Sequence, residues 1–100
     1  MSRFELASPA AADLLDIVRH THQRWGGAQA QSYREELELA LQHLSLTPDV
    51  GRRRGAIAAG LRSFPVVQHV AFYIQRKDKI LVLRILQPRM DVEDAFEKGE

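Results

Sequence analysis

The sequence predicts an α+β domain in which an N-terminal strand and an antiparallel helical hairpin precede a three-stranded antiparallel meander. Two observations carry this prediction. Apolar residues recur every three or four positions across residues 8–46, with one glycine pair as the interruption, whereas residues 60–90 alternate apolar and polar side chains with period two. Helices gathered on one side of an antiparallel sheet satisfy both patterns. A chain of 100 residues can bury one core, so we expect residues 1–100 to form a single domain.

The composition excludes several classes of protein. There is no cysteine, so neither a disulfide framework nor a thiolate metal site can form. The apolar runs are too short to span a bilayer, and the N-terminus lacks a basic segment followed by an apolar one. The four histidines lack metal-ligand spacing. We therefore expect a soluble cytoplasmic protein with no metal, no cofactor and no membrane contact.

Charge is distributed unevenly along the chain. Residues 1–51 carry four basic and seven acidic side chains, residues 52–89 carry nine basic and one acidic, and residues 90–100 carry one basic and five acidic. The basic segment indicates an acidic partner, either nucleic acid or an acidic protein. The alternative is that the acidic end of the same chain lies on the basic sheet.

The N-terminal third reads as a short strand followed by a helix. Residues 3–7 alternate apolar and polar side chains over a length that suits an edge strand. Ser8 is predicted to cap the helix, with Pro9 in its first turn, and Asp13 adds a weak dipole contribution. We expect Gly26-Gly27 to end the helix, because glycine tolerates the left-handed conformation of a C-terminal cap.

A second helix is predicted from about residue 28 to residue 46, antiparallel to the first because the connection is short. Proline at position 48 ends it. The following segment, Gly51–Gly55, lacks the sequence context of a phosphate-binding loop, so we interpret it as a solvated basic turn. Trp25 is predicted to fill the gap between the helices and the sheet.

Alternation in the middle strand of the meander separates Val70, Phe72 and Ile74 from His69, Ala71 and Tyr73. Such a pattern places the two sets on opposite sides of the sheet. We expect the first set to face the core. The other side, which would also carry basic residues, is where we expect function: Arg62, His69, Tyr73, Arg84.

A series of short residue groups runs through the chain in order: Ser8-Pro9-Ala10-Ala11, Asp13-Leu14, Trp25-Gly26, Gln29-Ala30, Tyr33, Pro48, Gly51, Gly60-Leu61-Arg62-Ser63-Phe64, His69-Val70, Phe72-Tyr73, Arg84-Ile85-Leu86, Arg89-Met90-Asp91. The order and spacing of these groups, over residues 4–91, resemble ParE-type toxins. These belong to the RelE/ParE superfamily of bacterial toxin–antitoxin modules. No single group is diagnostic, but the series is specific.

The resemblance implies a toxin that is neutralised by a ParD-like antitoxin and that poisons DNA gyrase by stabilising its DNA-cleaved state. Such a protein acts by binding and is not itself an enzyme; nucleic acid would be reached only through the antitoxin or gyrase. Candidate target-binding residues are Arg62, His69, Tyr73, Arg84, Arg89 and Met90. Candidate antitoxin-binding residues are Leu14, Val18, Trp25, Tyr33 and Leu37.

Two alternatives stay open. A RelE-type ribosome-dependent mRNA endonuclease needs cations at the phosphate and a C-terminal tyrosine or histidine for proton transfer. Arg62 and Arg84 match such cations, but neither tyrosine nor histidine follows Tyr73, and Gln87 stands where many ParE-like toxins have histidine. His69 or Tyr73 would have to supply the missing group. The second alternative is a relative that has lost toxicity and still binds an antitoxin.

Overall fold

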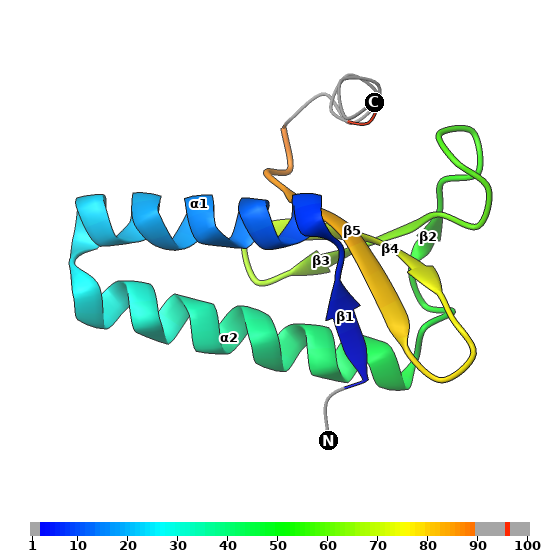
Figure 1. Cartoon of the computed structure of the whole chain (residues 1–100), viewed down its shortest axis with the longest axis horizontal. Coiled ribbons are helices and arrows are strands. Elements are labelled where there is room, and N and C mark those ends of the chain that lie inside the picture. The colour runs from blue at the N-terminus through cyan, green and yellow to red at the C-terminus, as the bar shows by residue number, and fades with distance from the viewer. Residues whose placement is uncertain (1–2, 90–95, 97–100) are drawn as a thin grey trace.

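A computed structural model describes residues 3–89 and Phe96, and it confirms the predicted α+β order (Figure 1). The two helices lie side by side on one side of the sheet. The elements, in chain order, are β1 (Phe4–Leu6), α1 (Ser8–Trp25), α2 (Gly27–Leu46), β2 (Arg52–Arg53), β3 (Arg62–Val66), β4 (His69–Gln75) and β5 (Ile80–Leu86).

The five strands form one sheet in the order β1-β5-β4-β3-β2. Strands β3, β4 and β5 make the antiparallel meander that the sequence predicts. Strand β1 is an edge strand, as expected, and it pairs in parallel with β5 through Phe4 opposite Ile80. The sequence had left open which edge β1 occupies. A parallel pair needs a long crossover connection, and everything from α1 to β4 lies within it here.

The helix boundaries follow from the backbone at two residues. Ala7 still belongs to the sheet, because its N–H donates to the carbonyl of Val82, while its own carbonyl accepts the N–H of Ala11. Helix α1 therefore begins at Ser8 with Ala7 as its N-cap, and the prediction that Ser8 caps it is wrong. Gly26, with φ of 95°, separates the helices as predicted.

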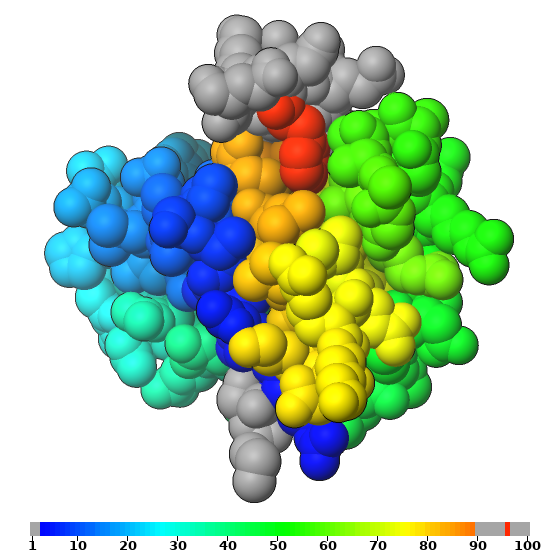
Figure 2. All heavy atoms as spheres, turned by 45° about the vertical axis from the view of Figure 1, so that its right-hand side comes forward, coloured from blue at the N-terminus to red at the C-terminus, as the bar shows by residue number. Residues whose placement is uncertain are grey.

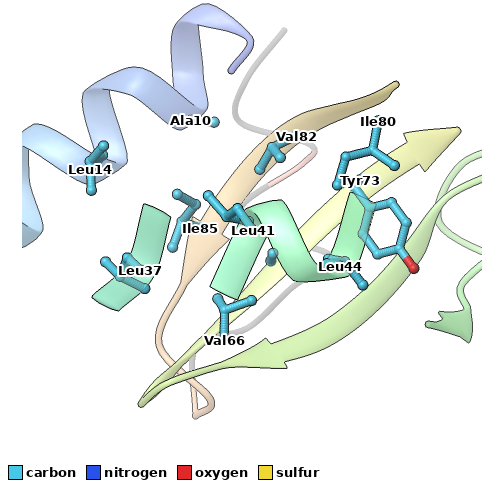
Figure 3. Packing of buried hydrophobic residues seen from close by; sticks show 11 residues of the cluster. Ala10, Leu14, Leu37, Leu41, Leu44, Val66, Tyr73, Ile80, Val82 and Ile85 are labelled. Atoms are coloured by element: carbon cyan, nitrogen blue, oxygen red, sulfur yellow. The ribbon is translucent and has the colours of Figure 1, made fainter. Parts of the chain in front are cut away.

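The main core lies between the helices and the sheet (Figure 3). Leu37, Leu41 and Leu44 of α2 face the sheet, and their burial contributes about 1.5–3 kcal/mol each to stability. The remaining buried members are Ala10, Leu14, Val66, Ala71, Tyr73, Ile80, Val82 and Ile85.

The side of the sheet that faces this core is the reverse of the prediction. Ala71 and Tyr73 point toward the helices, whereas Phe72 lies in a second cluster with Leu61 and Leu86. Val70, Ile74 and Phe96 are packed against that second cluster. Because both sides of the sheet bury apolar side chains, alternation alone did not identify the side that the helices cover.

A β-bulge in β5 is a second reason why alternation does not identify the side of the sheet that the helices cover. Phe72 pairs with Arg84, but Tyr73 pairs with Val82, so Leu83 is an extra residue in β5. The alternation of β5 therefore changes phase in mid-strand. Both Val82 and Ile85 reach the main core as a result, although they are an odd number of residues apart.

Candidate partner-binding site

Two of the predicted target-binding residues, Tyr73 and Arg62, hold the connection between α2 and β2. The hydroxyl of Tyr73 donates to the carbonyl of Pro48 at 2.8 Å and accepts the N–H of Gly51 at 3.1 Å. Arg62 donates from Nη1 to the carbonyl of Gly51 at 2.9 Å and to that of Asp49 at 3.2 Å. Burial raises the pKa of Tyr73, whose residue is 0% exposed. The Tyr73 hydroxyl is therefore used in holding the fold.

Gly51 is part of this arrangement and is not a solvated residue. A Cβ atom at Gly51 would lie 2.2 Å from the Tyr73 hydroxyl oxygen, so only glycine fits there without a shift. The next two residues pair with β3 as strand β2. The prediction of a solvated turn over Gly51–Gly55 is thus wrong for its first three residues.

Arg84 forms a two-point ion pair with Asp13 of α1. Arg84 Nε lies 2.7 Å from Asp13 Oδ2, and Nη2 lies 2.9 Å from Oδ1. Asp13 Oδ2 also accepts the N–H of Ile85 at 2.9 Å. Hydrogen bonding to Asp13 raises the pKa of Arg84. Because β1 pairs with β5 no further than Val82, the carboxylate takes the place of a neighbouring strand.

The sequence predicted only a weak dipole contribution from Asp13 and not its bonds to Arg84 and Ile85. A signal was available. Asp13 follows Ala10 by three residues and precedes Ile17 by four, and this spacing places it on the helix face that packs on the sheet. A carboxylate on such a face needs a partner, and an arginine on a neighbouring strand is a suitable one.

His69 and Tyr33, predicted for different partners, form one hydrogen-bonded pair. The hydroxyl of Tyr33 lies 2.7 Å from His69 Nδ1 and accepts the N–H of Gln68 at 3.1 Å. Which of the two groups donates in this bond depends on which imidazole nitrogen carries the proton. Burial lowers the pKa of His69 and raises the pKa of Tyr33. The pair joins α2 to the start of β4.

This pair lines a cavity of about 650 Å³ between the tip of the helical hairpin and the β3–β4 turn. The cavity also has charged and polar walls; its lining residues are His20, Thr21, Arg24, Trp25, Gln29, Tyr33, Glu36, Val67, Gln68 and His69. Most of this lining is polar or charged, Trp25 and Val67 are its large apolar side chains, and the shifted pKa values of Tyr33 and His69 are a feature often found at binding sites.

Trp25 does not fill the gap between helices and sheet, contrary to prediction. It is the last residue of α1, its side chain is 67% exposed, and the guanidinium of Arg24 lies 5.6 Å from its ring centre. The hairpin tip extends past the sheet, so no strand lies beneath this position (Figure 1).

Val67 lies across the cavity from Trp25, in the two-residue β3–β4 turn. Its φ of 58° is a left-handed value that β-branched side chains rarely adopt, and the residue is 45% exposed. Two exposed apolar side chains and one strained backbone position thus meet at the same cavity.

The other predicted residues are dispersed. Leu14 and Leu37 are core residues, 6% and 0% exposed, and present no surface to a partner. Val18 packs against the core edge. Arg89 is exposed, and Met90 lies outside the described residues. The structure therefore brings Trp25, Tyr33 and His69 together at one cavity and pairs Arg62 with Tyr73, but it does not gather the described target-binding candidates on one surface.

Within residues 3–89, no helix has the length and apolar character that crossing a bilayer requires. The same part of the chain has no group of three side chains placed to hold a metal ion.

Comparison with known proteins gives consistent results. The family model described as "ParE toxin of type II toxin-antitoxin system, parDE" matches residues 4–92. Toxin ParE1 of Mycobacterium tuberculosis is 37% identical over 93 residues, covering 92% of this chain and 95% of the relative. Toxin ParE1 of Caulobacter vibrioides is 32% identical, covering 91% and 94%. Toxin ParE of Escherichia coli is 31% identical, covering 92% and 90%.

The fold has a counterpart among solved structures. A chain of the "Chromosomal ParDE TA system from P. aeruginosa" superposes with a TM-score of 0.71 at 22% identity, covering 87% of this chain and 96% of that one. The sequence matches run from β1 through β5, so they include every element described above. The chain belongs to the ParE toxin family of type II toxin–antitoxin systems.

Proposed function

We propose that this chain is the toxin of a type II module, is neutralised by a ParD-like antitoxin, and inhibits DNA gyrase by stabilising the DNA-cleaved state. The observation that carries the proposal is the match of the ParE toxin family over residues 4–92, together with relatives named ParE in three genera. Gyrase is the enzyme in this proposal, and the chain supplies a binding surface.

The antitoxin is proposed to occupy the cavity at the hairpin tip. Trp25 and Val67 offer exposed apolar anchors, and Tyr33 and His69 form a polar wall between them. Segments that fold on binding place apolar side chains into such grooves, and aromatic residues at their centre dominate the affinity. Of the five antitoxin-binding candidates, Trp25 and Tyr33 are the two that line this cavity.

The gyrase contact is proposed for the surface that includes Arg89. Among the target-binding candidates in residues 3–89, Arg89 is the one with an exposed side chain, whereas Arg62 and Arg84 hold other parts of the fold. We expect Arg89→Ala to weaken gyrase inhibition and to leave thermal unfolding unchanged. Arg19→Ala, at an exposed arginine of α1, is the matched control.

The gyrase proposal is tested with the purified chain in supercoiling and DNA-cleavage assays. We expect supercoiling to fall and cleaved DNA to accumulate as toxin is added. If neither changes, and mRNA is instead cut in a translation extract, the RelE-type alternative replaces the proposal. That alternative would have to rely on His69, because the Tyr73 hydroxyl is bonded to two backbone groups and is 0% exposed.

The antitoxin proposal is tested by coexpression with the product of the neighbouring small gene and by titration calorimetry. Trp25→Ala is expected to weaken the complex at least about tenfold, as truncation of a central aromatic does. Leu39→Ala is the matched control, since Leu39 is 53% exposed and lies outside the cavity. Equal losses for the two variants would place the interface elsewhere, and failure of any neighbouring protein to copurify would count against an antitoxin.

A further inference from the structure

The structure gathers the basic segment at one end of the sheet. Strand β2, the first residue of β3 and the β4–β5 turn all lie at the end away from the tip of the helical hairpin (Figure 1). The β4–β5 turn and the segment around β2 occupy one side of the molecular surface (Figure 2). We call this surface the basic end and define it by six residues: Arg52, Arg53, Arg54, Arg62, Arg76, Lys77.

Within residues 3–89 no cation of the basic end forms an ion pair, although Arg76 interacts with Glu5 at longer range. The ion pairs among residues 3–89 are Arg34–Glu38, Lys79–Glu5 and Arg84–Asp13, and none of them includes a residue of the basic end. Within the same described range, Arg54 has in addition a buried Nε with no hydrogen-bond partner, and its guanidinium lies 5.7 Å from the ring of Phe72. The basic charge is thus unbalanced inside this part of the chain.

Two of these cations line one cleft. Arg53 and Arg62 are directly opposite each other on β2 and β3, an arrangement that repels when the charges have the same sign. They line a cleft of about 410 Å³ together with Gly55, Gly60 and Gln75. Arg62 is already oriented by the backbone carbonyls to which it donates. An anion in this cleft would remove the repulsion.

We propose that the basic end binds the phosphate backbone of duplex nucleic acid, so that this chain contacts DNA directly. Arginine suits this task because its planar guanidinium donates in pairs to phosphate oxygens. Five of the six cations that define the basic end are arginines.

The surroundings favour nucleic acid over an acidic protein. Protein interfaces rely on large apolar anchors. Of the exposed large apolar side chains in residues 3–89, two precede the basic end in sequence, Leu46 at the end of α2 and Val50 in the connection to β2. The others lie elsewhere on the helices or at the β3–β4 turn: Leu15, Trp25, Leu39, Val67.

The surroundings also favour a duplex over a single strand. Proteins that bind single strands stack the bases on exposed aromatic rings. The ring beside Arg54 is that of Phe72, which is 2% exposed and packs against Phe96. Backbone recognition without stacking is therefore expected, with no sequence preference and with strong dependence on salt.

This inference goes beyond the proposed gyrase contact, since it concerns the affinity of the chain itself for DNA. It is tested without gyrase, so the two proposals fail separately. The full chain is titrated into a fluorescently labelled 20-base-pair DNA of arbitrary sequence, and anisotropy is recorded over a series of salt concentrations. A single strand of the same sequence and a polyglutamate peptide serve as the other two probes.

The informative variant is Arg52→Gln/Arg53→Gln, and the matched control is Arg19→Gln/Arg34→Gln, at exposed arginines of α1 and α2, which makes the same change in net charge. Loss of two phosphate contacts is expected to lower affinity on the order of 10- to 100-fold at about 0.1 M salt and to reduce the salt slope by about 2. The control is expected to bind as the parent chain does.

Three results would overturn the proposal: equal losses in both double variants, tighter binding of the single strand than of the duplex, or binding of polyglutamate with the same sensitivity to Arg52 and Arg53 while DNA does not bind. Circular dichroism melting of each variant is recorded first, so that a folding defect is recognised. If Arg52→Gln/Arg53→Gln does not fold, Lys77→Gln with Arg76→Gln replaces it, because these two turn residues are exposed.

Discussion

Tyr73 and Tyr33 make similar contacts at opposite ends of β4, yet their surroundings differ. Each hydroxyl accepts a backbone N–H, from Gly51 in one case and from Gln68 in the other. Tyr73 is fully buried and has a second backbone partner, whereas Tyr33 opens onto a large cavity beside a histidine. A tyrosine hydroxyl thus fixes the α2–β2 connection near one end of β4, which we call the closed end, and lines a cavity near the other, which we call the open end.

At the closed end, substitution of Gly51 is expected to reduce stability most. We expect Gly51→Ala to lower the free energy of unfolding by about 3 kcal/mol, because its Cβ would overlap the Tyr73 hydroxyl. Gly55→Ala, where a Cβ meets open space, is expected to change it by less than about 1 kcal/mol. Urea denaturation measures both. Equal stability of the two variants would mean that the connection shifts freely.

Removing each hydroxyl compares the two ends directly. Tyr73→Phe leaves the Gly51 N–H and the Pro48 carbonyl without their partner, and we expect a loss of about 1–3 kcal/mol. Tyr33→Phe leaves an exposed Gln68 N–H that water can satisfy, so about 0.5–1 kcal/mol is expected. Thermal unfolding of both variants checks the order. A larger loss for Tyr33→Phe would reverse the comparison.

Strain at the open end can be relieved. Val67→Asn is expected to stabilise the chain by about 1 kcal/mol, because asparagine tolerates a positive φ that valine does not. Val50→Asn, at a valine that is 50% exposed and has a negative φ, is the matched control and is expected to be near neutral. If Val67→Asn also weakens antitoxin binding in calorimetry, the strained residue contributes to that surface.

The stability of the chain is expected to depend on pH through His69, which lines the cavity at the open end. Burial lowers the pKa of His69 in the folded chain below the unfolded value of about 6.5. Its contribution to stability is therefore present above about pH 6.5 and is lost as the pH falls through the lower folded pKa. We expect under about 1 kcal/mol, since the residue is half-buried. Urea midpoints from pH 8 to pH 5 should fall less in His69→Gln; an equal fall would assign the effect to other groups.

The order of elements could be predicted because it depends on local patterns. Helical periodicity, a glycine pair between residues 25 and 28, and alternation after residue 60 each lie within one short window. The side of the sheet that faces the helices could not, because Ala71 and Phe72 are both buried on opposite sides and the bulge at Leu83 changes the phase of β5.

Contacts between distant positions account for the remaining differences. Tyr73 and Gly51 are 22 residues apart in the sequence, and Arg84 and Asp13 are 71 apart, so no local pattern predicts either hydrogen bond. Trp25 shows a different cause. Burial of tryptophan is a tendency of the residue type, and the length by which a hairpin extends past its sheet decides the individual case.

The carboxylate of Asp13 accepts a hydrogen bond from a backbone amide at the edge of the sheet. Past Val82, the edge of β5 that faces away from β4 has no strand beside it among the described residues, and an amide on such an edge would ordinarily be free to pair with a strand from another molecule. A single side chain from α1 occupies that amide instead. Helix α1 thus blocks intermolecular strand pairing at this edge through Asp13. A shift of α1 by one turn would expose the Ile85 amide again.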